Sequence, residues 1–274
     1  MHTSYNMVGT STGRLSSSDP NLKNIPIRTE DGKRIREAFV AEDGHVLLSV
    51  DYSQVELRLA AEMADVVALK QAFKDGADIH AMTAARVFDV PLAEVTPEVR
   101  YKAKAVNFGI IYGISGWGLA KQLGIEPGEA NGFINRYLDA FSEIRDYMEA
   151  KKDEARAHEF VRTYHGRKCF TPNINAKIPA LKGGAERAAI NAPLQGTAAD
   201  IMKIAMVRMQ AALAEAGLAA KMLLQVHDEL IFEVPEGEID ATAEIVRVVM
   251  EGVVRLDVPL VAEAGQGTSW AEAH

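Results

Sequence analysis

The stretch MLLQVHDELIFEV, residues 222–234, decides the fold class of this chain. It contains two apolar runs that flank the polar triplet His227-Asp228-Glu229, and this pattern is typical of a β-hairpin with its most polar residues at the tip. A second apolar run, HVLLSVD at residues 45–51, likewise ends on a carboxylate, Asp51. Both patterns predict buried strands of a central sheet.

The chain around these strands is mainly helical. Residues 62–190 carry helical patterns interrupted by Gly and Pro, whereas residues 9–36 are predicted to be loops and turns. Because strands and helices are segregated and do not alternate regularly, we predict an α+β fold. Its antiparallel sheet is backed by helices, and a helical subdomain is inserted into it.

Four further elements are expected with defined ends. They are a small hairpin over 159–170, a helix that begins at a capping box over Thr197–Asp200 and stops at Gly217, a helix over 238–252, and a last strand over 258–262. The loop region is also rich in cations, namely Arg14, Lys23, Arg28, Lys33, Arg34 and Arg36. These cations give an acidic protein a local basic patch.

The composition excludes several classes of protein. The 274 residues are 48 % hydrophobic and 25 % charged, which is a globular balance and not that of a disordered chain or a coiled coil. The single cysteine, Cys169, excludes an internal disulfide and a cysteine-based zinc site. No apolar stretch reaches the roughly 20 residues of a membrane span, and residues 1–20 lack a signal-peptide pattern, so we expect no membrane association and a cytoplasmic location. The net charge of −8 argues against a nonspecific nucleic-acid coat but is compatible with acidic metal ligands beside basic patches.

Asp51 and Asp228 are candidate metal ligands, each placed where an apolar strand ends. Taken alone, Asp51 is better explained as a helix cap, and His227-Asp228-Glu229 as ordinary turn chemistry. Together they are more informative, because carboxylates that face each other across neighbouring strands repel unless a cation lies between them. Two metal ions held in this way would suit in-line displacement at phosphorus.

The segment 99–113 predicts a helix with two different faces. One stripe carries two cations followed by two aromatic rings, Arg100, Lys104, Phe108 and Tyr112. The other face is apolar and consists of Val99, Ala103, Val106 and Ile110. Cations suit a polyphosphate and aromatic faces suit a base, so the stripe matches a nucleotide; the alternative is an ordinary amphipathic helix. Gly109 and Gly113 favour the first interpretation, because glycine weakens a helix interior unless a close approach requires it.

Five segments of the chain together resemble the motifs of family A DNA polymerases, the bacterial DNA polymerase I type. They are TGRLSSSDPNLKNIP (12–26), DYSQVELR (51–58), RYKAKAVNFGIIYG (100–113), ERAAINAPLQGTAAD (186–200) and QVHDEL (225–230). They stand in the family's order and spacing, and the resemblance extends to SWAEAH at 269–274. It implies a palm over 1–60 and 191–274, fingers over 61–190, and a core without the thumb and exonuclease domains, for which we expect weak and salt-dependent DNA binding.

The resemblance implies a DNA-directed DNA polymerase that adds deoxynucleotides to a primer 3′ end in replication and repair, at the bacterial nucleoid. Its partners would be primer–template DNA and dNTP, and its oligomeric state is open. Asp51 and Asp228 match the carboxylates that hold two Mg²⁺ ions, which Mn²⁺ is able to replace, and the Tyr52 carbonyl matches a further ligand. Glu229 matches an accessory acidic residue, and Lys104 stands with these residues in catalysis.

The resemblance also implies residues that bind the substrates. Those that match the family's nucleotide contacts are Arg100, Lys104 and His80 for the phosphates, Phe108 and Tyr112 for the sugar and base, Glu56 for the selection of deoxyribose, and Gln54. Those that match its contacts to primer–template DNA, largely from the minor-groove side, are Arg14, Arg187, Asn191, Gln195 and His227. Minor-groove acceptors are nearly the same in every base pair, so such contacts test the shape of a pair without reading its sequence.

Two other functions remain as alternatives at this point. The first is a noncatalytic or very weakly active DNA-binding fragment, since no thumb is expected. The second is a metal-dependent phosphohydrolase that uses His80, His227 and Asp228, which would need a further cluster of metal ligands.

Overall fold

The structure is a computed structural model that describes residues 1–26 and 29–274; the basic-patch residue Arg28 lies outside the described residues. The chain forms two compact units. The first consists of Met1–Val55, Ala198–Leu256 and Leu260–His274, and the second of Glu56–Thr197 and Asp257–Pro259. No helix within the described residues is both long and apolar enough to cross a membrane.

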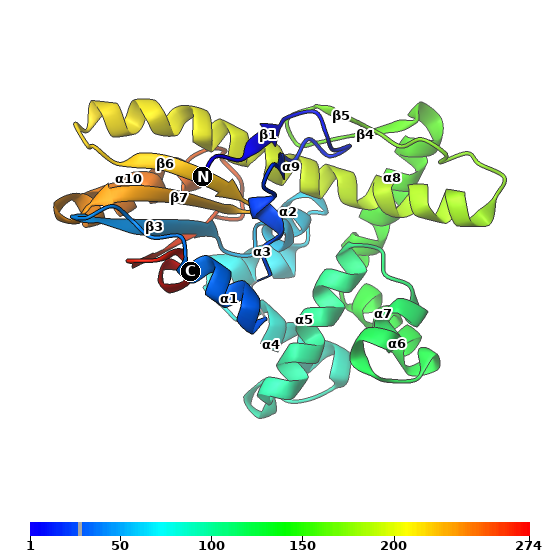
Figure 1. The fold of residues 1–274 in the computed structure, drawn as a ribbon. Helices are drawn as coiled ribbons and strands as arrows, with labels where there is room; N and C mark the ends of the chain where they lie inside the picture. Colours follow the sequence, from blue (N-terminus) through cyan, green and yellow to red (C-terminus); the bar gives the residue numbers. More distant parts are fainter. Residues whose placement is uncertain (27–28) are drawn as a thin grey trace. The chain divides into compact units, whose positions relative to one another are not determined.

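The first unit is built on a four-stranded antiparallel sheet, which confirms the predicted α+β class. The order of its strands is β6 (Lys221–Val226), β7 (Glu229–Pro235), β3 (His45–Tyr52) and β8 (Ala262–Gly267). Figure 1 shows β6, β7 and β3 side by side. The two most buried of the three apolar strands, β7 and β3, take the central positions of the sheet.

Helices cover both faces of this sheet. On one face, α10 (Ile239–Glu251) packs against β3, and the Tyr52 hydroxyl donates to the Met250 carbonyl at 2.6 Å. The other face carries Leu47, which clusters with Ile231 of β7 and Trp270 of α11 (Trp270–Ala273). Leu47 and Tyr52 lie on opposite faces because side chains alternate along a strand.

Two predictions for this unit are wrong. The region 9–36, predicted as loop, contains the helix α1 (Glu30–Glu37), whose N-cap Thr29 accepts from the Gly32 N–H and whose acidic first turn and basic last turn suit the helix dipole. The last strand is β8, not residues 258–262, because the Gly- and Ala-rich segment Ala262–Gly267 gains its strand conformation from pairing with β3. The remaining short elements of this unit are β1 (Ser4–Asn6) and β2 (Ser16–Ser18), which pair with each other, and the 3-10 helices η1 (Leu22–Asn24) and η3 (Glu236–Glu238).

The second unit is helical, as predicted, and it contains the predicted hairpin. Its helices are α2 (Val55–Met63), α3 (Val67–Lys74), α4 (Ile79–Phe88), η2 (Leu92–Glu94), α5 (Pro97–Ile111), α6 (Gly116–Leu123), α7 (Pro127–Ala140) and α8 (Ser142–His158). The hairpin pairs β4 (Phe160–Arg162) with β5 (Lys168–Phe170). Several helix starts carry side-chain caps; for α5, Thr96 accepts from the Val99 N–H and Pro97 fills the first turn.

The capping box predicted at Thr197–Asp200 is wrong, because α9 is one continuous helix over Pro179–Glu215. Thr197 lies in its interior, where its hydroxyl donates to the Pro193 carbonyl at 2.6 Å. Gly196 is required by packing: a Cβ there would lie 2.7 Å from Thr163 Cγ2 of the β4–β5 hairpin. The helix does end as predicted, at Gly217 with a positive φ of 68°.

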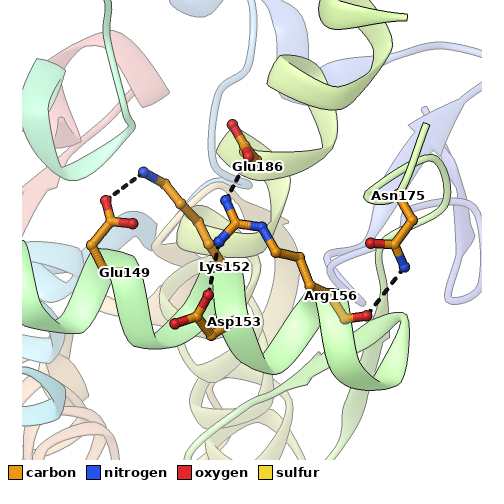
Figure 2. Close-up of polar contacts among 6 residues, drawn as sticks. All are labelled: Glu149, Lys152, Asp153, Arg156, Asn175 and Glu186. Carbon is orange, nitrogen blue, oxygen red and sulfur yellow. Dashed lines mark hydrogen bonds and ion pairs between the residues drawn. The ribbon is translucent and has the colours of Figure 1, made fainter. Parts of the chain in front are cut away.

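Within the second unit, α8 and α9 are joined by a polar network around Arg156 (Figure 2). One guanidinium nitrogen donates to Asp153 on the same helix and another to Glu186 of α9, both at 2.7 Å. The Arg156 carbonyl accepts from Asn175, and Lys152 pairs with Glu149 beside it. Arg156 thus links the two helices, as does Tyr147, whose hydroxyl donates to the Ile190 carbonyl at 3.2 Å.

We expect Glu186→Gln to lower the free energy of unfolding by about 0.2–1 kcal/mol at pH 7, because the ion pair with Arg156 is partly exposed. The Arg156 guanidinium holds the pKa of Glu186 below its ordinary value of 4.5, so the folded state gains stability from this pair above that pH and loses it as the pH falls through the lowered pKa. Thermal melts of both proteins between pH 3 and 8 measure this. Glu215→Gln, at the C-terminal end of the same helix, is the control that should not destabilise.

Candidate active site

The structure brings Asp51 and Asp228 to the same end of the central strands. Asp51 is the next-to-last residue of β3, and Asp228 belongs to the two-residue turn between β6 and β7. The Tyr52 N–H donates to the Asp228 carbonyl at 3.1 Å, which ties the strand to the turn. His227 adopts a left-handed conformation with φ of 50°, as a tight hairpin turn requires. The two predicted carboxylates are therefore held together by backbone geometry.

Negative charge is crowded around Asp51. Its register partners on the two neighbouring strands are Glu229 and Glu263. Burial, assisted by Asp228, Glu229 and Glu263, raises the pKa of Asp51 to about 7. Burial also raises the pKa of Asp228, against the opposing influence of Arg14 and other cations. Such a cluster of carboxylates is stabilised by a divalent cation.

The few oxygen ligands at this site suit Mg²⁺, which needs few ligands from the protein. Among residues 1–26 and 29–274, no group of three or more His, Cys, Asp or Glu side chains is arranged to hold a metal ion. Mg²⁺ needs no such cage, because it is commonly bound by one or two carboxylates together with waters and substrate phosphates. This site offers two carboxylates, those of Asp51 and Asp228, and in addition the Tyr52 carbonyl. The phosphohydrolase alternative needs a further cluster of metal ligands, and none is found among the described residues.

Glu229 is held away from the hairpin tip. It is the first residue of β7 and is 3 % exposed. The hairpin turn therefore consists of His227 and Asp228 alone, and not of the predicted three residues. Its Oε1 accepts from Ser49 Oγ at 2.5 Å and from Trp270 Nε1 at 3.2 Å, and lies 3.4 Å from His274 Nδ1. These contacts make Glu229 a buried anchor of the sheet end beside Asp51.

Two supporting residues were missed by the sequence analysis. The Gln225 side chain donates from Nε2 to the His227 carbonyl at 2.5 Å, and its Oε1 accepts from Lys23 Nζ at 2.8 Å. Burial, with the nearby charge of Arg14, lowers the pKa of Lys23 to about 8. Both side chains line a small pocket with Arg14, His227 and Asp228. The signal that could have found Gln225 is its position as a polar residue inside an apolar strand.

The second unit carries the predicted nucleotide stripe on α5. Ala103, Val106 and Ile110 are buried, whereas Arg100 and Lys104 are exposed. Phe108 and Tyr112 are half-buried, and their rings stack with centroids 6.3 Å apart. Arg100 donates from Nε to Asp78, the N-cap of α4, at 2.5 Å. The fourth residue of the predicted apolar face, Val99, is half-buried, so the predicted division between an accessible stripe and an apolar face holds for three of its four apolar residues. The role of the stripe toward a nucleotide stays a prediction.

The two glycines of this helix have local explanations. A Cβ at Gly109 would lie 2.9 Å from Ile114 Cγ2, so the close approach that requires glycine comes from the protein itself. Gly113 lies just past the C-cap Tyr112 with a φ of 68°, where glycine ends a helix at low cost. Neither glycine therefore supports the nucleotide interpretation of the stripe, which stays a prediction.

The other predicted nucleotide residues lie on both units. His80, in the first turn of α4, is 3 % exposed, and its ring lies 5.9 Å from that of Phe108. Glu56 is buried in the first turn of α2. Gln54, in the first unit, has a positive φ of 53° and a buried Oε1 that accepts no hydrogen bond from the described residues. Their predicted roles toward a nucleotide remain predictions.

The predicted DNA contacts also divide between the units. Arg187, Asn191 and Gln195 recur every four residues on α9 and so share one face of it. Arg187 is exposed, and Asn191 donates to the carbonyl of Tyr112 at 3.2 Å. Arg14 and His227 lie together on the first unit, at the pocket that includes Asp228.

A family model for DNA polymerase family A matches residues 1–272. The chain belongs to DNA polymerase family A. It is 53 % identical over 274 residues to DNA polymerase I of Pseudomonas aeruginosa and 47 % identical over 273 residues to the thermostable DNA polymerase I of Thermus aquaticus. All of this chain is covered in both cases, and it spans 30 % and 33 % of those proteins' lengths.

A solved structure supports the same assignment to family A. The chain matches the POL domain of Pol1 from M. smegmatis, in complex with DNA primer-template and dNTP, with a TM-score of 0.95 and 46 % identity. That match covers all of this chain and 48 % of the other. The family resemblance drawn from the five motifs is thus confirmed.

Proposed function

We propose that this family A chain is a DNA-directed DNA polymerase, which adds deoxynucleotides to a primer 3′ end by nucleotidyl transfer. The observation that carries the proposal is the backbone hydrogen bond between Tyr52 and Asp228, because it holds two half-buried carboxylates, those of Asp51 and Asp228, at one site. The high identity to DNA polymerase I proteins over the whole of this chain supports it. With DNA as its substrate, the proposed location is the cytoplasm, at the bacterial nucleoid or its equivalent.

The Asp51 and Asp228 carboxylates and the Tyr52 carbonyl would hold a pair of Mg²⁺ ions, for which Mn²⁺ is able to substitute. When bound, such ions activate the primer hydroxyl and neutralise charge on the phosphates. Glu229 keeps the sheet end in place through Ser49 and Trp270. The site is rigid because its ligands lie on strands and on a two-residue turn.

The residues of the α5 stripe would bind the incoming dNTP. Arg100 and Lys104 supply positive charge for the triphosphate, with His80 as a further phosphate contact, and Lys104 assists the transfer by neutralising charge that develops there. Phe108 and Tyr112 offer ring faces to the sugar and base. Following the family resemblance, Glu56 would select deoxyribose, and Gln54 would be a further nucleotide contact.

Primer–template DNA would be contacted by Arg14, Arg187, Asn191, Gln195 and His227. The spacing of the three α9 residues along one helix face suits the tracking of a groove. We assign the palm to residues 1–60 and 191–274 and the fingers to 61–190. Fingers closure on a matched nucleotide would then supply selectivity by induced fit.

Extension of a labelled primer on four templates that differ in the first unpaired base tests this function. With Mg²⁺ and each dNTP in turn, the complementary nucleotide alone should be added efficiently. If the protein binds primer–template DNA but adds no nucleotide, at protein concentrations above the Kd for that DNA, the result would instead support the DNA-binding alternative. Addition that ignores the template base would contradict the proposal.

A further inference from the structure

Three buried polar side chains of the second unit form a hydrogen-bonded chain between α4 and α5. Thr83 Oγ1 donates to Asn107 Oδ1 at 3.0 Å, and Asn107 Nδ2 lies 3.0 Å from His80 Nδ1. Thr83 and Asn107 are fully buried, and His80 is 3 % exposed. Polar groups buried to this degree cost free energy unless they are paired, so their arrangement is specific.

The side-chain amide of Asn107 determines which group donates and which accepts in this series of hydrogen bonds. The Thr83 hydroxyl donates to the Asn107 oxygen, and the NH₂ group of Asn107 therefore faces His80. An NH₂ group only donates, so Nδ1 of His80 has to accept with its lone pair. A neutral imidazole that accepts at Nδ1 carries its proton at Nε2.

We propose that Asn107, oriented by Thr83, is a positioning residue that fixes His80 as the neutral tautomer protonated at Nε2. The ring then has a single N–H donor, and that donor is the group that would contact a dNTP phosphate. The contact between His80 and a dNTP phosphate rests on the proposed function, whereas the tautomer of His80 does not. No direct contact of Asn107 with the nucleotide is required.

The surrounding charges support a neutral ring. Burial, together with the cations Arg100 and Lys104, lowers the pKa of His80 to about 4, and Asp78 acts in the opposite direction. A protonated ring would also turn an N–H at Nδ1 toward the Asn107 NH₂ group. His80 thus stays neutral at pH 7 and donates without carrying charge.

The tautomer is measured directly by ¹⁵N NMR of histidine side chains in the chain without nucleotide. The expected result is one neutral form with the proton on Nε2. In Asn107→Asp the new carboxylate accepts from Nδ1–H, so the proton should move to Nδ1 or the ring should become charged, with its pKa raised by about 1–3 pH units. In Thr83→Val the amide loses its orientation, and both tautomers should appear.

Thr242→Val is the matched control, because Thr242 is also fully buried and its hydroxyl has no partner among the described residues. It should leave the His80 spectrum unchanged, as should Thr83→Ser, which keeps the hydroxyl. A wild-type His80 protonated at Nδ1, or a spectrum that Asn107→Asp and Thr83→Val leave unchanged, would overturn the proposal. These readouts need no polymerase activity, so they are independent of the proposed function.

The consequence for the nucleotide is read from steady-state kinetics. In Thr83→Val only the fraction of molecules that keeps the proton on Nε2 donates to the phosphate, so KM for dNTP should rise as the inverse of that fraction, about twofold for an equal mixture of tautomers. The value of kcat should change little, because the contact is made before and during the reaction. Thr83→Ser should restore KM. If the tautomer shifts and KM does not, the role of His80 toward the phosphate is contradicted.

Discussion

Asp228→Ala is expected to lower the rate of nucleotide incorporation by about 1,000-fold or more. The substitution removes one of two half-buried carboxylates that share a site, and a divalent ion held there would contribute several kcal/mol to the stabilisation of transition-state charge. The fold should survive, because Asp228 lies in a turn and its backbone carbonyl still accepts from Tyr52. Single-turnover primer extension with Mg²⁺ measures the rate.

Asp240→Ala is the matched control for this prediction. Asp240 is an exposed carboxylate in the first turn of α10, in the same unit as Asp228. The control should extend the primer at the wild-type rate and melt close to the wild-type temperature. If Asp228→Ala were as active as Asp240→Ala, the metal-ligand role of Asp228 would have to be abandoned.

Lys104→Ala should lower kcat/KM for dNTP by about 100-fold. Lys104 is exposed on α5, between Arg100 and the stacked rings of Phe108 and Tyr112, where an ammonium can reach a triphosphate. Removal of one charged donor to a reacting phosphate typically costs this much. The measurement is the dependence of the single-nucleotide incorporation rate on dNTP concentration.

Lys102→Ala provides the comparison on the same helix. Lys102 pairs with Glu98 at 2.8 Å and belongs to no predicted contact with the nucleotide. Its loss should leave kcat/KM near the wild-type value, since an exposed i,i+4 pair contributes little. Equal losses in the two variants would show that general positive charge, and not the position of Lys104, explains the effect.

Local sequence patterns were sufficient for three of the four strands of the sheet, β3, β6 and β7, and for the positions of Asp51 and Asp228 at their ends. The runs at 45–51 and 222–234 have strong strand patterns, and the carboxylates follow directly from where these runs end. The position of β8 could not be predicted, because Ala262–Gly267 has weak strand propensity and depends on β3 for its pairing. The length of α9 was missed for a related reason: Gly196 resembles a helix boundary, yet it lies inside the helix because the neighbouring Thr163 leaves no room for a Cβ there.

The parts of the site that support the functional residues depend on contacts between distant residues. Lys23 reaches Gln225 across 202 positions of sequence, and Asn107 reaches His80 across 27. No local periodicity encodes such pairs, so they are visible only once the chain is folded. The family motifs place the residues that would touch substrate, whereas the fold shows what orients them.

The central claim is that Asp51 and Asp228 act as one site, and a double-mutant cycle tests it most directly. The rate of single-nucleotide incorporation is measured for the wild-type chain, Asp51→Ala, Asp228→Ala and the double variant under the same Mg²⁺ concentration. Residues that act as a unit are strongly non-additive, so the double variant should be no slower than either single variant. A double variant that loses the product of the two single effects would show that the carboxylates act independently, and would contradict this account.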